Sequence, residues 1–278
     1  MAVGGATGAG EISPGAISGR SSERAFLGVS ALLFAVSAPA TILWCGSMSA
    51  MGGMAMPGGW TMSMAWMRMP GESWAGAAAS FLGMWIAMMA AMMLPSLVPM
   101  LRRYRRAVGG AGGMRLEWLT ALVGLAYFVV WSAIGLAAFP LGVWLAAAEM
   151  RLPALSREVP IAAGALVLAA GLIQFSAWKA HCLACCREAP ARGLALPADA
   201  GAAWRHGLGL GLSCAYCCAG PMAVLFVAGI MDLRAMAVVT AAITLERFAP
   251  AGERVARAIG AVAVGAGLLL IARAAGLG

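Results

Sequence analysis

The chain has 278 residues, of which 62% are hydrophobic and only 11% are charged. Soluble domains carry roughly 25% charged residues, so a chain of this composition cannot cover its own surface as a soluble globular domain. A transmembrane barrel is also excluded, because its alternating strands give no long apolar runs. The composition therefore predicts an all-α, polytopic membrane helical bundle. The formal net charge of +8 requires no nucleic acid partner, because Lys and Arg mark the cytoplasmic side of membrane proteins.

Residues 1–24 are rich in Gly, Ser and Ala, and we expect them to form a disordered N-terminal tail ahead of a membrane domain over 25–278. About seven apolar runs follow, and a membrane-spanning helix needs about 20 such residues. They lie at about 25–46, 76–100, 116–138, 159–178, 207–230, 235–249 and 255–274. Residues 139–158 are too short and too charged to cross, and we expect them to lie in the membrane interface.

The positive charges predict an orientation for this bundle in the lipid bilayer. With the N-terminus on the cytoplasmic side, 14 of the 19 Lys and Arg residues fall in cytoplasmic segments and the other five in outer ones. Cytoplasmic loops of membrane proteins carry such an excess. The segment over 47–75 then lies outside and the loop over 179–206 lies inside, and we expect a multi-pass protein with a cytoplasmic N-terminus.

The outer loop over 47–75 is rich in methionine. Its eight methionines are Met48, Met51, Met54, Met56, Met62, Met64, Met67 and Met69, and Gly and Pro between them predict an irregular backbone. Thioethers are good ligands for Cu(I) and weak ones for Zn(II) or Mg(II). The alternative is an apolar surface that packs on the membrane or on a partner, because Met is a flexible filler. The lack of matching Leu and Ile favours copper.

Methionines continue into the second apolar run. At 100° per residue, Met84, Met88 and Met92 share one face of a helix, and Met89 and Met93 extend that face to half of the helix surface. A methionine stripe on a buried helix is typical of packing as well as of ligation. We take Met88, Met92 and Met93 as candidate soft-metal ligands.

Six of the seven cysteines fall in two C-x-x-C-C triplets. On a helix, offsets of 0, 3 and 4 residues place three sulfurs on one face. Thiolates at this spacing suit Cu(I), Zn(II) or an iron–sulfur cluster, although Cys is also a small apolar residue that packs in helices. The repeated triplet favours a metal site. Its candidate ligands are Cys182, Cys185 and Cys186 in the first triplet and Cys214, Cys217 and Cys218 in the second.

Two further residues extend these triplets. His181 adjoins Cys182 and is a candidate fourth ligand, while Met222 lies on the face of Cys214. Pro221 has no N–H, so it leaves the carbonyl of Cys217 without its helical partner. We expect the isolated Cys45 to be a packing residue and Glu246, at the end of an apolar run, to face the membrane interface.

Several segments together resemble the DUF2182 family of bacterial membrane proteins, described as predicted metal-binding proteins or copper chaperones of the polyphenol oxidase B2 type. They read MMLPSLVPM, GLIQFSAWKAHCLACCREAP, GLGLGLSCAYCCAGPMAVLFVAGIMDL and ITLERF, and the resemblance covers about residues 80–275. Matching positions include Gln174, Lys179 and Glu246, together with Cys182, Cys185, Cys214, Cys217 and Cys218. The resemblance also implies a bacterial inner membrane as the location of the protein. The resemblance implies copper handling on behalf of a copper enzyme, whereas ligand spacing alone indicates only a soft metal.

We therefore expect a membrane protein that binds Cu(I), or alternatively Zn, through Met and Cys and delivers it to a copper-dependent enzyme or membrane enzyme complex. No catalytic constellation is evident, and no nucleotide-binding motif indicates a pump. One alternative is a membrane thiol–disulfide oxidoreductase that uses its cysteine pairs. Another is an accessory or structural subunit of a membrane copper oxidase or monooxygenase complex.

Overall fold

The computed structural model describes residues 14–68, 71–108, 112–188 and 195–276. Within these ranges eight helices alternate with short connections. The helices are α1 (Pro14–Ala50), α2 (Trp74–Ala107), α3 (Gly113–Arg151), α4 (Pro153–Ile173), α5 (Ala177–Glu188), α6 (Ala200–Ala228), α7 (Leu233–Phe248) and α8 (Gly252–Ala274). The remaining elements are strands β1 (Gly53–Met56) and β2 (Trp60–Ser63) and the 3-10 helix η1 (Met64–Trp66).

Six of these described helices are long and apolar enough to cross a membrane, namely α1, α2, α3, α4, α6 and α8. The predicted all-α polytopic bundle is thus confirmed, and the protein is a multi-pass membrane protein. The predicted span over 235–249 corresponds to α7, which has 16 residues. At 1.5 Å per residue it is about 24 Å long, shorter than the roughly 30 Å of bilayer hydrocarbon.

Four local expectations need correction. Residues 14–24, predicted to belong to the disordered tail, begin α1, while residues 1–13 lie outside the described part. The predicted interfacial segment over 139–158 instead lengthens α3 to Arg151 and begins α4 at Pro153. The predicted inner loop over 179–206 contains most of α5, together with the start of α6. The methionine-rich loop, expected to be irregular, contains an antiparallel hairpin in which Met54 pairs with Met62.

The start of α1 is helical because charged and polar side chains hold it against α2 and α3. Arg105 lies 2.8 Å from a carboxylate oxygen of Glu117 and donates to the Ser22 hydroxyl at 2.6 Å. Arg102 pairs with Glu23 at 2.6 Å. Sequence patterns within the tail did not reveal these long-range partners.

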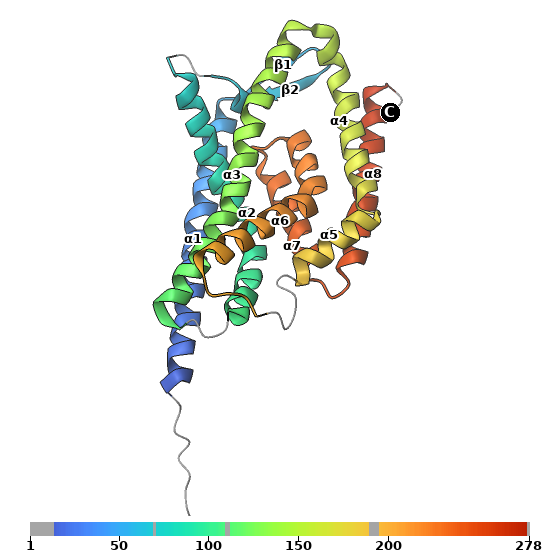
Figure 1. The fold of residues 1–278 in the computed structure, drawn as a ribbon. Coiled ribbons are helices and arrows are strands. Elements are labelled where there is room, and N and C mark those ends of the chain that lie inside the picture. The colour runs from blue at the N-terminus through green and yellow to red at the C-terminus, as the bar shows by residue number, and fades with distance from the viewer. Residues whose placement is uncertain (1–13, 69–70, 109–111, 189–194, 277–278) are drawn as a thin grey trace, which may run out of the picture.

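The hairpin is fixed to the other end of the bundle. The Trp60 indole N–H donates to the Ser156 carbonyl at 3.0 Å, and the Ser156 hydroxyl donates to the Pro57 carbonyl at 2.9 Å. Met56 and Met62 are buried against Ala146 of α3. The hairpin and the α3–α4 turn lie at one end of the molecule, and α5 and the start of α1 lie towards the other (Figure 1).

Glycines allow α4 and α8 to pack closely. A Cβ on Gly164 would lie 3.1 Å from the Gly267 carbonyl oxygen, and one on Gly171 would lie 2.9 Å from the Gly260 carbonyl oxygen. Small residues at such spacing let membrane helices approach backbone to backbone. In Figure 1, this pair stands on one side of α6 and α7, and α1, α2 and α3 stand on the other. Helices α6 and α7 therefore lie in the interior, where the second cysteine triplet is found.

Candidate metal centre

The second cysteine triplet faces the interior of the bundle. Cys214, Cys217 and Cys218 on α6 are all buried, with at most 2% of each residue exposed. The Cys214 and Cys218 sulfurs are 3.9 Å apart, as expected for residues one helical turn apart. The helix thus presents its three sulfurs inward, as the spacing predicted.

The first triplet is divided between the interior and the surface. Cys186 on α5 is buried and its thiol donates to the Ser213 carbonyl of α6 at 3.2 Å. Cys182 is half-buried, and its pKa is raised first by burial and then by the negative charge of Cys217. Cys185 is exposed and lies 3.6 Å from Nε2 of His181, which is exposed as well. The buried thiols and the exposed Cys–His pair therefore occupy different faces of α5.

A buried arginine from α7 lies among the interior sulfurs. Nη2 of Arg247 is 3.0 Å from the Cys214 sulfur, 3.2 Å from that of Cys218 and 4.0 Å from that of Cys186. Its Nη1 donates to the Ser96 hydroxyl of α2 at 2.9 Å. Burying a guanidinium is costly unless an anion or several acceptors compensate it. The environment of Arg247 therefore favours negative charge on these sulfurs.

Two more side chains complete the surroundings of Cys214. The Tyr127 hydroxyl of α3 lies 2.9 Å from the Cys214 sulfur, and the Met93 sulfur of α2 lies 3.9 Å from it. A phenol beside a sulfur can donate a hydrogen bond to a thiolate. Cys214 thus has a thiol, a thioether, a phenol and a guanidinium around it.

A buried ionic network lies behind the second triplet. The Lys179 ammonium is 2.7 Å from the Glu246 carboxylate and donates to the Cys217 carbonyl at 2.7 Å. Gln174 donates to the other Glu246 oxygen at 2.7 Å. Pro221 has no N–H to donate to the Cys217 carbonyl, and the Lys179 ammonium takes the place of that missing donor. The expectation that Glu246 faces the membrane interface was wrong, because its partners hold it inside the bundle.

The methionine stripe of α2 is buried along its whole length. Met84, Met88, Met89, Met92 and Met93 all belong to the main core cluster, as does Met222 of α6. Of these, Met93 has a sulfur within 4 Å of a cysteine sulfur. The stripe therefore runs through the core and reaches the cysteines at Met93.

Sequence reasoning missed Arg247 and Tyr127. Arg247 ends an apolar run next to Glu246, and an ionisable residue in such a place is itself a sign of function. Tyr127 carried no such signal, because a tyrosine within an apolar helix is common. Within the described ranges, no group of three or more His, Cys, Asp or Glu side chains converges as a metal site.

The fold and these contacts define a polytopic membrane protein with a buried site, here called the cysteine cluster. It consists of Cys186, Cys214, Cys217, Cys218, Met93, Tyr127 and Arg247. The model of the PpoB2 copper chaperone family matches residues 82–270, and the chain belongs to this family. No curated protein and no solved structure matches the chain. The matched region runs from α2 into α8 and contains every residue of the cluster. The family membership supports a copper-handling role for this protein.

Proposed function

We propose that the protein is a Cu(I)-binding membrane chaperone that holds the ion between Cys214, Cys218 and Met93. Three sulfurs placed about 2.3 Å from one ion at 120° are about 4.0 Å apart, if the metal–sulfur bond resembles that of zinc. Cys214 is 3.9 Å from both Cys218 and Met93. Two of the three edges of such a triangle therefore already have the expected length, and this agreement is the observation that carries the proposal.

The charges of the site favour Cu(I). Two thiolates and one Cu(I) carry a net charge of −1, and the adjacent Arg247 guanidinium brings the total to zero. Neutrality matters in a buried site because an uncompensated charge is costly there. Two thiolates and a thioether form a soft donor set, whereas structural zinc is usually held by four protein ligands with no open coordination position. Copper is thus the cargo that this donor set fits best.

Transfer requires ligands beyond the resting site. Cys186 adjoins the buried sulfurs through Arg247, and Cys217 occupies the same helix between the two proposed thiolates. Cys182, Cys185 and His181 continue the series to the surface of α5. We infer that they pass Cu(I) on to a copper-dependent enzyme or membrane enzyme complex. The excess of Lys and Arg in the predicted cytoplasmic segments, 14 of 19, supports a cytoplasmic N-terminus. The family supports a location in a bacterial inner membrane.

The test is the variant Cys214→Ser/Cys218→Ser, purified under reducing conditions after Cu(I) loading. Serine keeps the shape of the site but offers a hard oxygen, so we expect most of the buried copper to be lost. Its matched control is Ala215→Ser/Ala219→Ser, which adds two hydroxyls to α6 and leaves all sulfurs in place. Copper is counted by elemental analysis, and its ligands are identified by X-ray absorption.

Full copper content in the cysteine variant, with unchanged metal–sulfur scattering, would refute this site. Copper-free wild-type protein that instead catalyses thiol–disulfide exchange would identify the oxidoreductase. Stoichiometric recovery with a mature copper enzyme would identify an accessory subunit.

A further inference from the structure

A second group of sulfurs lies at the hairpin end of the bundle, apart from the cysteine cluster. It surrounds a small cavity of about 70 Å³. The methionines that line this cavity are Met48, Met64, Met67, Met84 and Met231. Trp44, Glu72 and Ser80 also line it, and Trp44 and Ser80 are exposed. The cavity therefore reaches the surface and is large enough for a metal ion.

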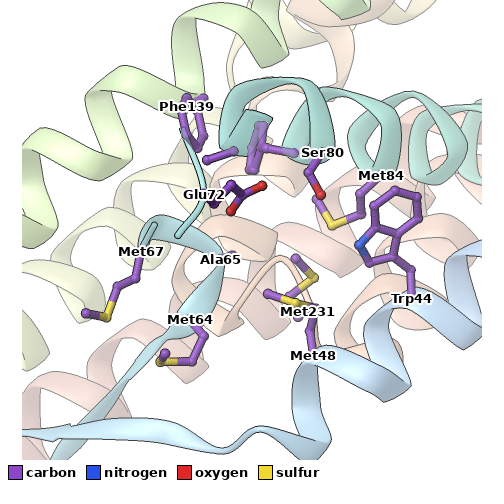
Figure 2. Close-up of a pocket in the computed structure, with 12 residues that line it drawn as sticks. Trp44, Met48, Met64, Ala65, Met67, Glu72, Ser80, Met84, Phe139 and Met231 are labelled. Carbon is purple, nitrogen blue, oxygen red and sulfur yellow. The ribbon is translucent and has the colours of Figure 1, made fainter. Parts of the chain in front are cut away.

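Three of these thioethers come together from distant parts of the chain. Met48 ends α1, Met84 belongs to α2, and Met231 lies in the turn between α6 and α7. Figure 2 shows Met48, Met84 and Met231 gathered beside Trp44, with Met64 and Met67 on the other side of the view. The Met231 sulfur also lies 3.8 Å from that of Cys45. Packing alone does not require the thioethers of three elements to meet at one open cavity.

The structure divides the methionines of the hairpin segment by role. Met56 and Met62 are buried against Ala146 and act as packing residues. Met51 and Met54 are exposed. Met48, Met64 and Met67 line the cavity, and Met69 lies outside the described residues. The described methionines of this segment thus include both packing residues and cavity-lining residues, and only some of them line the cavity.

The cavity connects with the cysteine cluster through α2. Met84 lines the cavity and Met93 lies 3.9 Å from Cys214. Nine residues of helix separate them, which is about 14 Å. Met88, Met89 and Met92 lie between them and are buried in the same core. Buried thioethers therefore occupy the stretch of α2 between one sulfur group and the other.

We propose that this cavity is an uptake site for Cu(I), bound by the thioethers of Met48, Met84 and Met231. Neutral thioethers select a soft monovalent ion, and the Glu72 carboxylate at the cavity supplies the negative charge that attracts a cation. A Cu(I) held by three neutral ligands keeps its charge and binds more weakly than at the thiolates. The ion can therefore move on along α2 to Cys214. That onward step rests on the proposed function, whereas binding in the cavity does not.

The test separates the two sites by using a background in which all seven cysteines are replaced by Ser, because Cys45 adjoins the cavity and Cys182 and Cys185 would otherwise supply thiolates. Purified protein is titrated with Cu(I) under ascorbate, with bicinchoninate as the competing chelator. We expect this background to retain one weakly bound ion per chain with only thioether sulfur scattering. Adding Met48→Leu/Met84→Leu/Met231→Leu should abolish it, because Leu keeps the volume and removes the ligand. The matched control is Met56→Leu/Met62→Leu, which changes two buried packing methionines.

The outcomes of this experiment are distinct. Retention of the weak ion in the triple Leu variant overturns the uptake site, and so does an equal loss in the Met56/Met62 control. A background that never binds copper also overturns it and leaves the cysteine site standing. In the chain with all its cysteines, the triple Leu variant should keep the thiolate-bound ion and fill it more slowly. The Cys214→Ser/Cys218→Ser variant tests the proposed function separately, because it should lose the thiolate-bound ion, which the triple Leu variant keeps.

Discussion

The Arg247 guanidinium lies 3.0 Å from the Cys214 sulfur, inside a bundle of apolar helices. In the proposed function, this cation is the electrostatic partner of an anionic metal–thiolate group. If that is its role, the charge of residue 247 should control copper affinity more than its shape does.

Arg247→Met keeps much of the side-chain length and removes the charge. We expect it to weaken Cu(I) binding by about 10- to 100-fold, the range observed when partners outside the ligand shell are removed. Arg247→Lys should lose less. Competition with a Cu(I) chelator measures both, and Arg234→Met, on the exposed face of α7, is the control. Tighter copper binding by Arg247→Met would show that the arginine opposes metal binding.

Lys179 and Glu246 form a buried pair, so removing one partner should be worse than removing both. Lys179→Met leaves an unpaired carboxylate and should cost about 3–5 kcal/mol of unfolding free energy. The variant Lys179→Met/Glu246→Gln should recover much of this loss. Denaturant unfolding of the detergent-solubilised protein gives the comparison. A double variant less stable than Lys179→Met would contradict the expectation.

The close contact of α4 and α8 depends on Gly267. A Cβ there would lie 2.6 Å from the Leu168 backbone nitrogen, whereas one on Gly265 would meet nothing within 4 Å. Gly267→Ala should therefore destabilise the protein by about 1–3 kcal/mol through overpacking. Gly265→Ala should leave stability unchanged or raise it slightly. Thermal unfolding of the two variants checks this, and equal midpoints would argue against close packing of these helices.

The orientation can be tested at two exposed residues from opposite ends of the bundle, Thr61 of β2 and Met114 of α3. Each is changed to Cys in a chain whose native cysteines are replaced. We expect an impermeant maleimide to label Thr61→Cys in intact spheroplasts and Met114→Cys only after permeabilisation. Labelling of both from the same side would rule out the predicted orientation.

The helices were largely predictable because apolar length and Pro, Gly and charged boundaries are local features. The predicted start of the span at residue 76 lies close to the observed start of α2 at Trp74. What the sequence did not reveal depends on contacts between distant segments. The helical start of α1 needs Arg105, and the hairpin needs Ser156. Neither partner can be identified from its own neighbourhood.

The candidate site, like the fold, was predictable where it depends on local sequence and not where it depends on contacts between distant segments. The inward face of Cys214, Cys217 and Cys218 follows from helical periodicity, and the structure places all three in the interior. The separation of Cys185 from Cys186 does not follow from spacing, because it depends on how α5 docks against α6. Arg247 was missed for another reason: at the end of an apolar run, a charged side chain can either reach the membrane surface or point inward as part of a functional site. Only the tertiary fold turns it inward.

The cysteine cluster draws on five separate helices, and the last of them in chain order is α7, which carries Arg247. Met93, Tyr127 and the cysteines all emerge from the ribosome earlier. An unfinished chain therefore has its sulfurs in the membrane while the cation that lies among them is still being synthesised. If copper binds there as proposed, its capture is tied to the synthesis of α7, and a chain truncated before Arg247 does not form the full set of partners.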